Sequence, residues 1–185
     1  MSDLLETLEA LHQGLVVGYP TEGVFGVGCD PDKPAAIEKL LTIKQRPKSK
    51  GLILIAANFA QLAPYVDLSS IDASTQERIF ASWPGPVTWV LPASEITSDW
   101  VTGQFDTVAV RVSDHPLVIQ LCEGFGKPLI STSANLSGQP SATTYAEVEQ
   151  QLGDQLAAIL FGPTGGRDKP SAIYDGLTGR VIREG

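Results

Sequence analysis

The sequence predicts an α/β fold in a single domain over residues 1–185, with an open, twisted, mixed sheet and flanking helices. First, stretches with helical periodicity alternate with short runs rich in β-branched residues, and no long polar linker, repeat or low-complexity segment separates them. Second, 43% of the residues are hydrophobic and 18% are charged, which is typical of a globular chain with a sizeable core. Third, 18 glycines and 13 prolines indicate many connections, which suits a mixed sheet better than a regular doubly wound one.

The first part of the chain predicts two helices and one strand. The first helix stops at Gly14 and places three leucines on one face, namely Leu4, Leu8 and Leu11. Residues 15–19 form an apolar run that predicts a buried strand ending at Pro20. The second helix begins near Pro34, because proline is favoured in the first turn, and ends before Pro47. Its predicted core face consists of Ile37, Leu40 and Leu41.

The rest of the chain continues the alternation of strands and helices. Apolar runs predict strands buried on both faces at residues 52–55, 87–91, 107–112 and 128–131. Further helices are predicted at residues 72–82 and 115–123. Thr144 and Glu147 have capping-box spacing, which predicts a helix that begins there and ends at Gly153. Three late strands are predicted at residues 157–161, 171–174 and 180–182.

A basic segment at residues 39–50 stands out because the chain as a whole is acidic, with a formal charge of -8. No acidic residue occurs between Lys39 and Tyr65, whereas the basic segment contains five cations, namely Lys39, Lys44, Arg46, Lys48 and Lys50. Such a local positive field predicts an anion site, and a polyphosphate fits it. The pI near 4.7 argues against a protein that coats nucleic acid, although a focused contact with RNA through this segment remains open.

Several common kinds of site are disfavoured by the sequence. Cys29 and Cys122 lack metal-ligand or redox spacing and are interpreted as small buried hydrophobic residues. His12 and His115 are isolated, which gives neither a metal cluster nor a triad. Residues 162–169 are rich in glycine but fail the Walker pattern, and no G-x-G-x-x-G or G-x-S-x-G occurs. No membrane span or secretory signal is recognised, so a cytoplasmic protein is expected.

Polar segments follow the ends of the predicted apolar strands and supply cations and hydroxyl groups. They lie at residues 20–22, 44–47, 111–113 and 131–138. Arginine and lysine suit phosphate oxygens, while serine, threonine and asparagine can bind phosphates, a ribose or a carboxylate. This composition predicts a site that binds and positions its substrates without a covalent nucleophile.

The order of these motifs resembles that of the YrdC-like family, and within it the short, single-domain threonylcarbamoyl-AMP synthases of the TsaC type. The resemblance covers nearly the whole chain. It is carried by Pro20-Thr21-Glu22, Lys44-x-Arg46-Pro47, Trp83-Pro84-Gly85-Pro86-Val87-Thr88, Arg111 and Ser133-x-Asn135-x-Ser137-Gly138. It implies a YrdC-like fold with a deep, basic, concave cavity.

The resemblance also implies an enzyme, a nucleotidyltransferase that condenses L-threonine, bicarbonate or CO2, and ATP into threonylcarbamoyl-AMP and pyrophosphate. The product is used in modifying adenosine 37 of tRNA, a step carried out by a separate transferase complex. Mg2+ is expected with the ATP phosphates, and neither a protein metal site nor a prosthetic group is implied. Lys44 and Arg46 are the implied catalytic residues.

Binding roles follow from the same resemblance. The residues implied to bind ATP are Lys44, Arg46, Lys50, Thr107, Ser133, Asn135, Ser141 and Arg183. Those implied to surround threonine are Thr21, Arg111, Ser131 and Ser171. Two alternatives remain open. One is a non-catalytic RNA-binding module that uses the basic segment. The other is an enzyme that uses carbamoyl phosphate, since a YrdC-like domain also occurs inside hydrogenase-maturation carbamoyltransferases.

Overall fold

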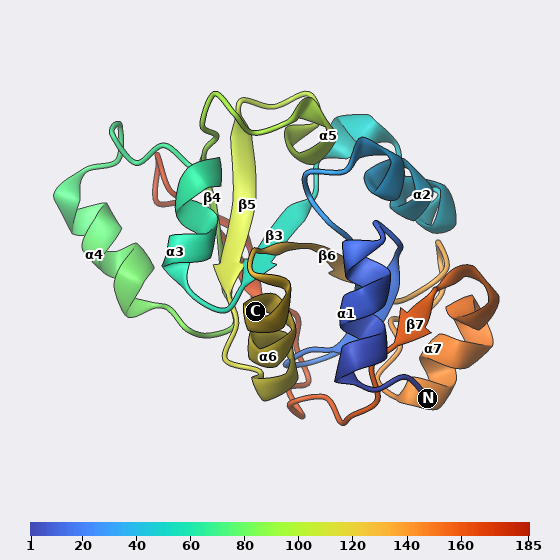
Figure 1. Ribbon diagram of the computed structural model, residues 1–185. Helices are drawn as coiled ribbons and strands as arrows, with labels where there is room; N and C mark the ends of the chain where they lie inside the picture. The colour runs from blue at the N-terminus through green and yellow to red at the C-terminus, as the bar shows by residue number, and fades with distance from the viewer.

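The computed structural model describes residues 1–185 and shows an α/β fold built on one mixed sheet (Figure 1). The sheet has nine strands in the order β7-β1-β2-β6-β3-β5-β4-β8-β9. Their bounds are β1 Val17–Pro20, β2 Phe25–Gly28, β3 Ile53–Ala56, β4 Val87–Pro92, β5 Thr107–Val112, β6 Leu129–Ser133, β7 Ala158–Ile159, β8 Ala172–Asp175 and β9 Val181–Arg183. Parallel pairs join β1 to β7, β3 to β5 and β4 to β8, and the other neighbours are antiparallel, which confirms the predicted mixed sheet.

The helices flank this sheet, and most begin with a cap that the sequence supplies. They are α1 Leu4–His12, α2 Pro34–Lys44, α3 Phe59–Leu62, α4 Ala73–Ala81, α5 Asp99–Thr102, α6 Pro116–Phe125 and α7 Tyr145–Leu152. The predicted capping box of α7 is present, with the Thr144 hydroxyl accepting from the Glu147 backbone at 3.3 Å and the Glu147 carboxylate accepting from the Thr144 backbone at 3.2 Å. No helix has the length and apolar character needed to cross a membrane.

The sequence missed one strand and two short helices. Strand β2 went unpredicted because Gly26 and Gly28 interrupt its apolar run. Gly28 is required there, since a Cβ at this position would collide with the backbone oxygen of Ile130 on β6. The helices α3 and α5 have four residues each, too few to show helical periodicity. The late strands β7 and β9 are shorter than predicted, with two and three residues.

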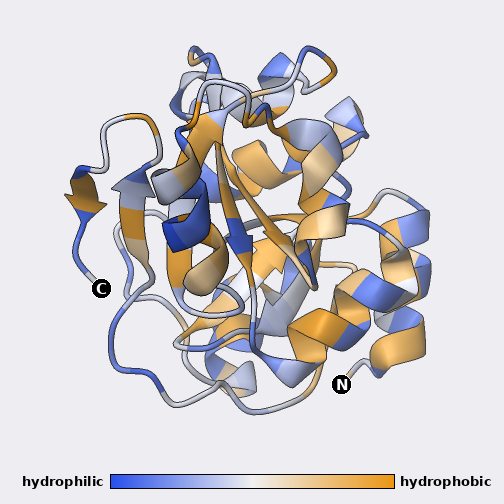
Figure 2. Cartoon of the chain, turned by 90° about the vertical axis from the view of Figure 1, so that its left-hand side faces the viewer, coloured by the Kyte–Doolittle hydropathy of each residue, from blue (hydrophilic) through white to orange (hydrophobic).

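Alternation along the strands separates the two faces of the sheet. On β5, Val108 and Val110 are buried in the main core together with Leu40 of α2 and Ile79 of α4. This face of the sheet is therefore covered by helices, as the hydrophobic colour of the central strands in Figure 2 indicates. Arg111, on the opposite face of β5, is paired in register with Ile55 of β3.

The opposite face is covered by helices over only part of its area. There α1 and α6 lie side by side (Figure 1), and Leu11 and Leu121 pack in a second core with Tyr19, Ile55 and Leu129 of the sheet. The uncovered part of this face carries the polar residues of β5 and β6. Its position explains where a ligand can reach the sheet.

Candidate functional site

A cavity of about 1080 Å³ opens over the uncovered part of the sheet. Its walls come from segments far apart in the sequence, including β2, β3, β5, β6, β8 and β9. Most of the residues that the sequence analysis assigned to ATP or threonine line it, namely Thr21, Arg46, Lys50, Thr107, Arg111, Ser131, Ser133, Ser141, Ser171 and Arg183. The two exceptions are Lys44 and Asn135. The fold therefore gathers residues that the sequence places in separate loops.

Strand periodicity explains how the central residues reach the cavity. Thr107, Ala109 and Arg111 alternate with buried valines along β5, so all three face the same side. Ser131 and Ser133 have the same spacing on β6 and also line the cavity. The polar residues at the ends of these strands are thus directed into one space by a period of two.

The cavity lining carries more positive than negative charge. Six cationic side chains line it, namely Arg46, Lys50, Arg111, Arg167, Lys169 and Arg183, against the carboxylates of Glu22 and Asp168. This excess contrasts with the charge of -8 on the whole chain. A lining of this kind attracts an anionic ligand into an otherwise acidic protein.

Arg46 is held at one end of the cavity by the loop that follows α2. Gln45 ends that helix in the left-handed conformation, with φ of 47°. The guanidinium of Arg46 then donates from Nη2 to the backbone oxygen of Gly51 at 2.9 Å and from Nε at 3.3 Å. Gly51 itself has φ of 66°, and a Cβ there would lie 2.8 Å from the Thr102 backbone oxygen. Glycine at this position therefore allows the contact that orients Arg46.

Lys44 lies behind the cavity wall and supports it. Its Nζ donates to the backbone oxygens of Ser133 at 2.6 Å and Asn135 at 2.7 Å, and to Asn135 Oδ1 at 2.8 Å. Asn135 Oδ1 also accepts from Ser133 Oγ at 2.7 Å. Partial burial, followed by the neighbouring charge of Arg46, lowers the pKa of Lys44 to about 8. Lys44 and Asn135 thus fix the segment that places Ser133 in the cavity.

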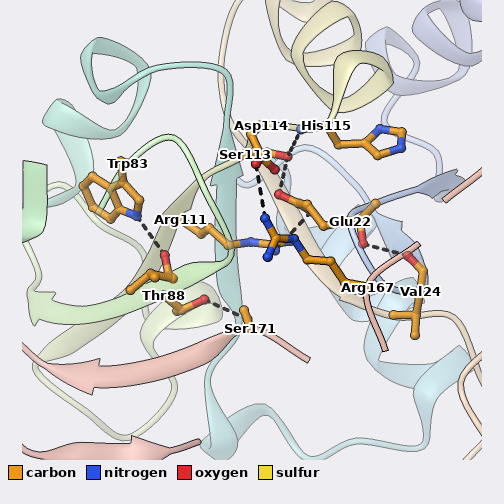
Figure 3. A network of polar contacts seen from close by, with 12 residues as sticks. Glu22, Val24, Trp83, Thr88, Arg111, Ser113, Asp114, His115, Arg167 and Ser171 are labelled. Atoms are coloured by element: carbon orange, nitrogen blue, oxygen red, sulfur yellow. Dashed lines mark hydrogen bonds and ion pairs between the residues drawn. The ribbon is translucent and has the colours of Figure 1, made fainter. Parts of the chain in front are cut away.

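A buried ion pair lies at the other end of the cavity (Figure 3). Arg111 Nη1 is 3.1 Å from Glu22 Oε2, and Ser113 Oγ donates to Glu22 Oε1 at 2.8 Å. Burial favours the neutral acid, but the charge of Arg111 and the hydrogen bond from Ser113 outweigh it and hold the pKa of Glu22 below its usual value. The sequence analysis did not assign Glu22 to the site, although it directly follows Thr21 in the quoted motif.

Residues 162–170 cross the cavity beside this ion pair. The backbone N–H groups of Gly165 and Arg167 donate to the backbone oxygens of Thr21 and Glu22, at 2.9 and 3.0 Å. The Arg167 side chain extends toward Asp114, with 3.6 Å between the charged atoms (Figure 3). The sequence analysis rejected this glycine-rich segment as a Walker loop and gave it no other role. Its glycines instead permit close contact with the backbone of Glu22.

Ser171 connects the C-terminal strands to the same cavity. Arg183 Nη2 on β9 donates to the backbone oxygen of Ser171 at 2.7 Å and lies 3.3 Å from its Oγ. The Ser171 hydroxyl is also 3.2 Å from Thr88 Oγ1 on β4 (Figure 3). These bonds place a serine from one predicted set beside an arginine from the other.

Comparison with known proteins identifies relatives of the whole chain. A family model named for Sua5, YciO and YrdC, with the description telomere recombination, matches residues 9–185. A protein of Vibrio parahaemolyticus named threonylcarbamoyl-AMP synthase is 60% identical over 185 residues, which cover 100% of both chains. Relatives from other Vibrio species share this name.

Solved structures have the same fold. The crystal structure of Escherichia coli YciO matches with a TM-score of 0.85 and 25% identity, over 98% of this chain and 88% of that one. The structure of P. abyssi Sua5 complexed with L-threonine matches with a TM-score of 0.86 and 31% identity, over 93% of this chain. The match spans 50% of the P. abyssi chain, so the protein described here corresponds to about half of it.

Proposed function

This chain belongs to the Sua5, YciO and YrdC family, and we propose that its cavity binds ATP beside L-threonine for the synthesis of threonylcarbamoyl-AMP. The chain is an enzyme of the nucleotidyltransferase type, like the relatives that share up to 60% of its sequence. Its reaction condenses L-threonine, bicarbonate or CO2, and ATP, and releases pyrophosphate. The product serves the threonylcarbamoyl modification of tRNA adenosine 37.

The observation that carries the assignment of the two substrates is the presence of two different polar ends in one cavity. Thr107 and Arg111 lie on the same face of β5, and about 3.3 Å per residue separates them by roughly 13 Å. The register of β3 and β5 places Gly51 and its partner Arg46 near the Thr107 end. We assign the phosphates of ATP to the end with Arg46 and Lys50, and threonine to the end with Arg111.

The remaining predicted residues divide in the same way. Thr107, Ser133, Asn135, Ser141 and Arg183 would hold the nucleotide, with Lys44 completing the phosphate-binding set. Thr21, Ser131 and Ser171 would surround threonine, and Arg111 would pair with its carboxylate through parallel hydrogen bonds. Mg2+ would enter as part of the ATP substrate and bridge phosphate oxygens.

The chemistry requires positioning and charge neutralisation. The threonine amine forms a C–N bond to CO2 and loses a proton, which gives a carbamate. A carbamate oxygen then attacks the α-phosphorus, the bond from that phosphorus to the bridging oxygen breaks, and pyrophosphate leaves with the electron pair. Charge on the leaving group increases during this step, so cations at Arg46 and Lys50 stabilise the transition state more than the bound ATP.

The product is expected to pass to a separate transferase complex that acts on tRNA, which places the reaction in the cytoplasm. The cationic lining could also bind RNA weakly through its phosphates. In the alternative RNA-binding module, binding of this kind would be the whole function. Steep salt dependence of RNA binding without any turnover of ATP would favour that alternative.

The test is the release of pyrophosphate from ATP and Mg2+, with and without L-threonine and bicarbonate. The proposal predicts release that requires both additions, and less release when serine or carbamoyl phosphate replaces threonine or bicarbonate. Release with carbamoyl phosphate alone would indicate the carbamoyltransferase-like activity. No release from folded protein under any of these conditions would overturn the proposal.

A further inference from the structure

We propose that Glu22 receives the amino group of threonine and, together with Arg111, sets the orientation of the amino acid in the cavity. This inference rests on the proposed function and deepens it, because it assigns the part of the substrate that no predicted residue was expected to bind. Threonine enters as a zwitterion, whose ammonium needs an acceptor. Glu22 is a carboxylate at the threonine end of the cavity.

One oxygen of Glu22 has no directed hydrogen bond. Glu22 is 4% exposed, and its Oε2 is buried without a hydrogen-bond partner in the protein. Arg111 lies 3.1 Å from that oxygen, which gives charge compensation without the geometry of a hydrogen bond. Buried polar atoms are nearly always hydrogen-bonded, and leaving one without a partner is unfavourable. A ligand N–H group would satisfy it.

The rest of the Glu22 residue is firmly held. Its other carboxylate oxygen accepts from Ser113 Oγ, which in turn accepts from the His115 backbone N–H at 3.1 Å. Ser113 is completely buried. The backbone oxygen of Glu22 accepts from the Arg167 N–H. Glu22 is therefore fixed before the substrate arrives, which is the arrangement expected of a residue that orients a ligand.

Charge favours the same assignment. A cavity whose lining is mostly cationic attracts the threonine carboxylate but repels its ammonium. The other carboxylate in the lining, Asp168, is exposed, so Glu22 provides the buried negative charge beside Arg111. The lowered pKa of Glu22 keeps this carboxylate ionised at neutral pH.

Glu22 can keep its contact throughout the reaction. The nitrogen of threonine carries at least one N–H as ammonium, as neutral amine and as carbamate. A carboxylate with a lowered pKa is a weak base, so its role is to hold the nitrogen in place while another nitrogen position forms the bond to carbon. Glu22 is thus a substrate-positioning residue in this inference.

The test compares two ligands and two variants by calorimetric or fluorescence titration in the presence of an ATP analogue. The ligands are L-threonine and (R)-3-hydroxybutanoate, which keeps the carboxylate, hydroxyl and methyl groups but lacks the amine. The wild-type protein should prefer L-threonine, and Glu22→Gln should weaken L-threonine by roughly 10- to 100-fold while changing the affinity for the hydroxy acid much less. Asp114→Asn, which removes a nearby carboxylate outside the cavity, should preserve the preference.

The outcomes separate the inference from the proposed function. Equal weakening of both ligands by Glu22→Gln would mean that Glu22 only orients Arg111, and this would overturn the inference. So would a wild-type protein that binds the two ligands equally well, a result that needs no folded variant. Failure of the wild-type protein to bind L-threonine or the ATP analogue at all would instead count against the proposed function.

Discussion

Lys44 and Asn135 are joined by two hydrogen bonds, because Lys44 Nζ lies 2.7 Å from the backbone oxygen of Asn135 and 2.8 Å from its Oδ1. A third bond, to the backbone oxygen of Ser133, uses the last donor of the ammonium. The residue predicted to clamp phosphate is therefore occupied by the wall of the cavity. A phosphate that contacts Lys44 would have to replace one of these acceptors.

Replacement of the two predicted catalytic cations should abolish most of the activity. Lys44→Ala and Arg46→Ala are each expected to cost roughly 2 to 4 kcal/mol of transition-state stabilisation. Arg46→Ala removes a cation from the cavity, whereas Lys44→Ala also releases the segment of Ser133 and Asn135. The measurement is kcat/KM for pyrophosphate release, with circular dichroism to confirm folding. Near-normal turnover in both folded variants would refute the assignment of the phosphate end.

Gly51→Ala should impair ATP use without touching any ligand. The left-handed φ of 66° and the contact with the Thr102 backbone disfavour a side chain, and the resulting shift would move the oxygen that holds Arg46. Gly126→Ala is a matched control, since Gly126 has φ of 83° but no atom within 4 Å of an added Cβ. Both variants should lose about 1 kcal/mol of stability or more. Only Gly51→Ala should raise the KM for ATP.

Binding of ATP should weaken as the pH rises through about 8, the pKa of Lys44. Neutral Lys44 has two N–H groups instead of three and cannot satisfy Ser133 and Asn135 fully. Lys44→Arg keeps its charge over this range and should remove the pH dependence. Titration with an ATP analogue in the absence of threonine is the appropriate measurement, because the amine of threonine also loses a proton in this range. A variant with the same pH profile as the wild-type protein would exclude Lys44 as the titrating group.

The same pKa determines the sign of a stability effect. The pKa of Lys44 in the folded protein, about 8, is below its ordinary value of 10.5. The folded chain thus holds this proton less tightly than the unfolded chain, and ionised Lys44 opposes folding at neutral pH. That unfavourable contribution is complete below pH 8 and disappears as the pH rises toward 10.5. Urea unfolding of the wild-type protein and of Lys44→Met should therefore differ less at high pH.

Arg111→Lys should affect threonine much more than ATP. Lysine keeps a positive charge beside Glu22 but cannot form parallel hydrogen bonds to a carboxylate. An increase of about tenfold or more in the KM for threonine is expected, with little change in the KM for ATP. Steady-state assays that vary one substrate at saturating levels of the other provide the test. Equal changes in both constants would indicate a general distortion of the cavity.

Local patterns predicted most of the elements but not how they meet. Strand β5 was predicted with the bounds that it has, because its apolar alternation is unbroken, and the capping box located the start of α7. Strand β2 was missed because glycine occupies alternate positions, where sequence patterns favour a turn. Those glycines are explained only by β6 and Tyr19, which lie far along the chain or on another strand.

The candidate site shows the same limit. Motif order placed most of its residues, but it gave no sign that Lys44 would be satisfied by oxygens 89 and 91 residues further on. It also gave no sign that Glu22 would meet Ser113, which is 91 residues away. Burial and partners of charged groups depend on such long-range contacts, and a single sequence does not reveal them.

Strand β6 has a consequence for how the site forms in time. It pairs with β2 on one side and β3 on the other, and so it joins the group β7-β1-β2 to the group β3-β5-β4-β8-β9. Until residues 129–133 insert between these groups, the cavity lacks Ser131 and Ser133 and its two parts are not connected. Ligands should therefore recognise the molecule only after the folding barrier has been crossed. Saturating ATP and threonine should slow unfolding while leaving the rate of folding nearly unchanged.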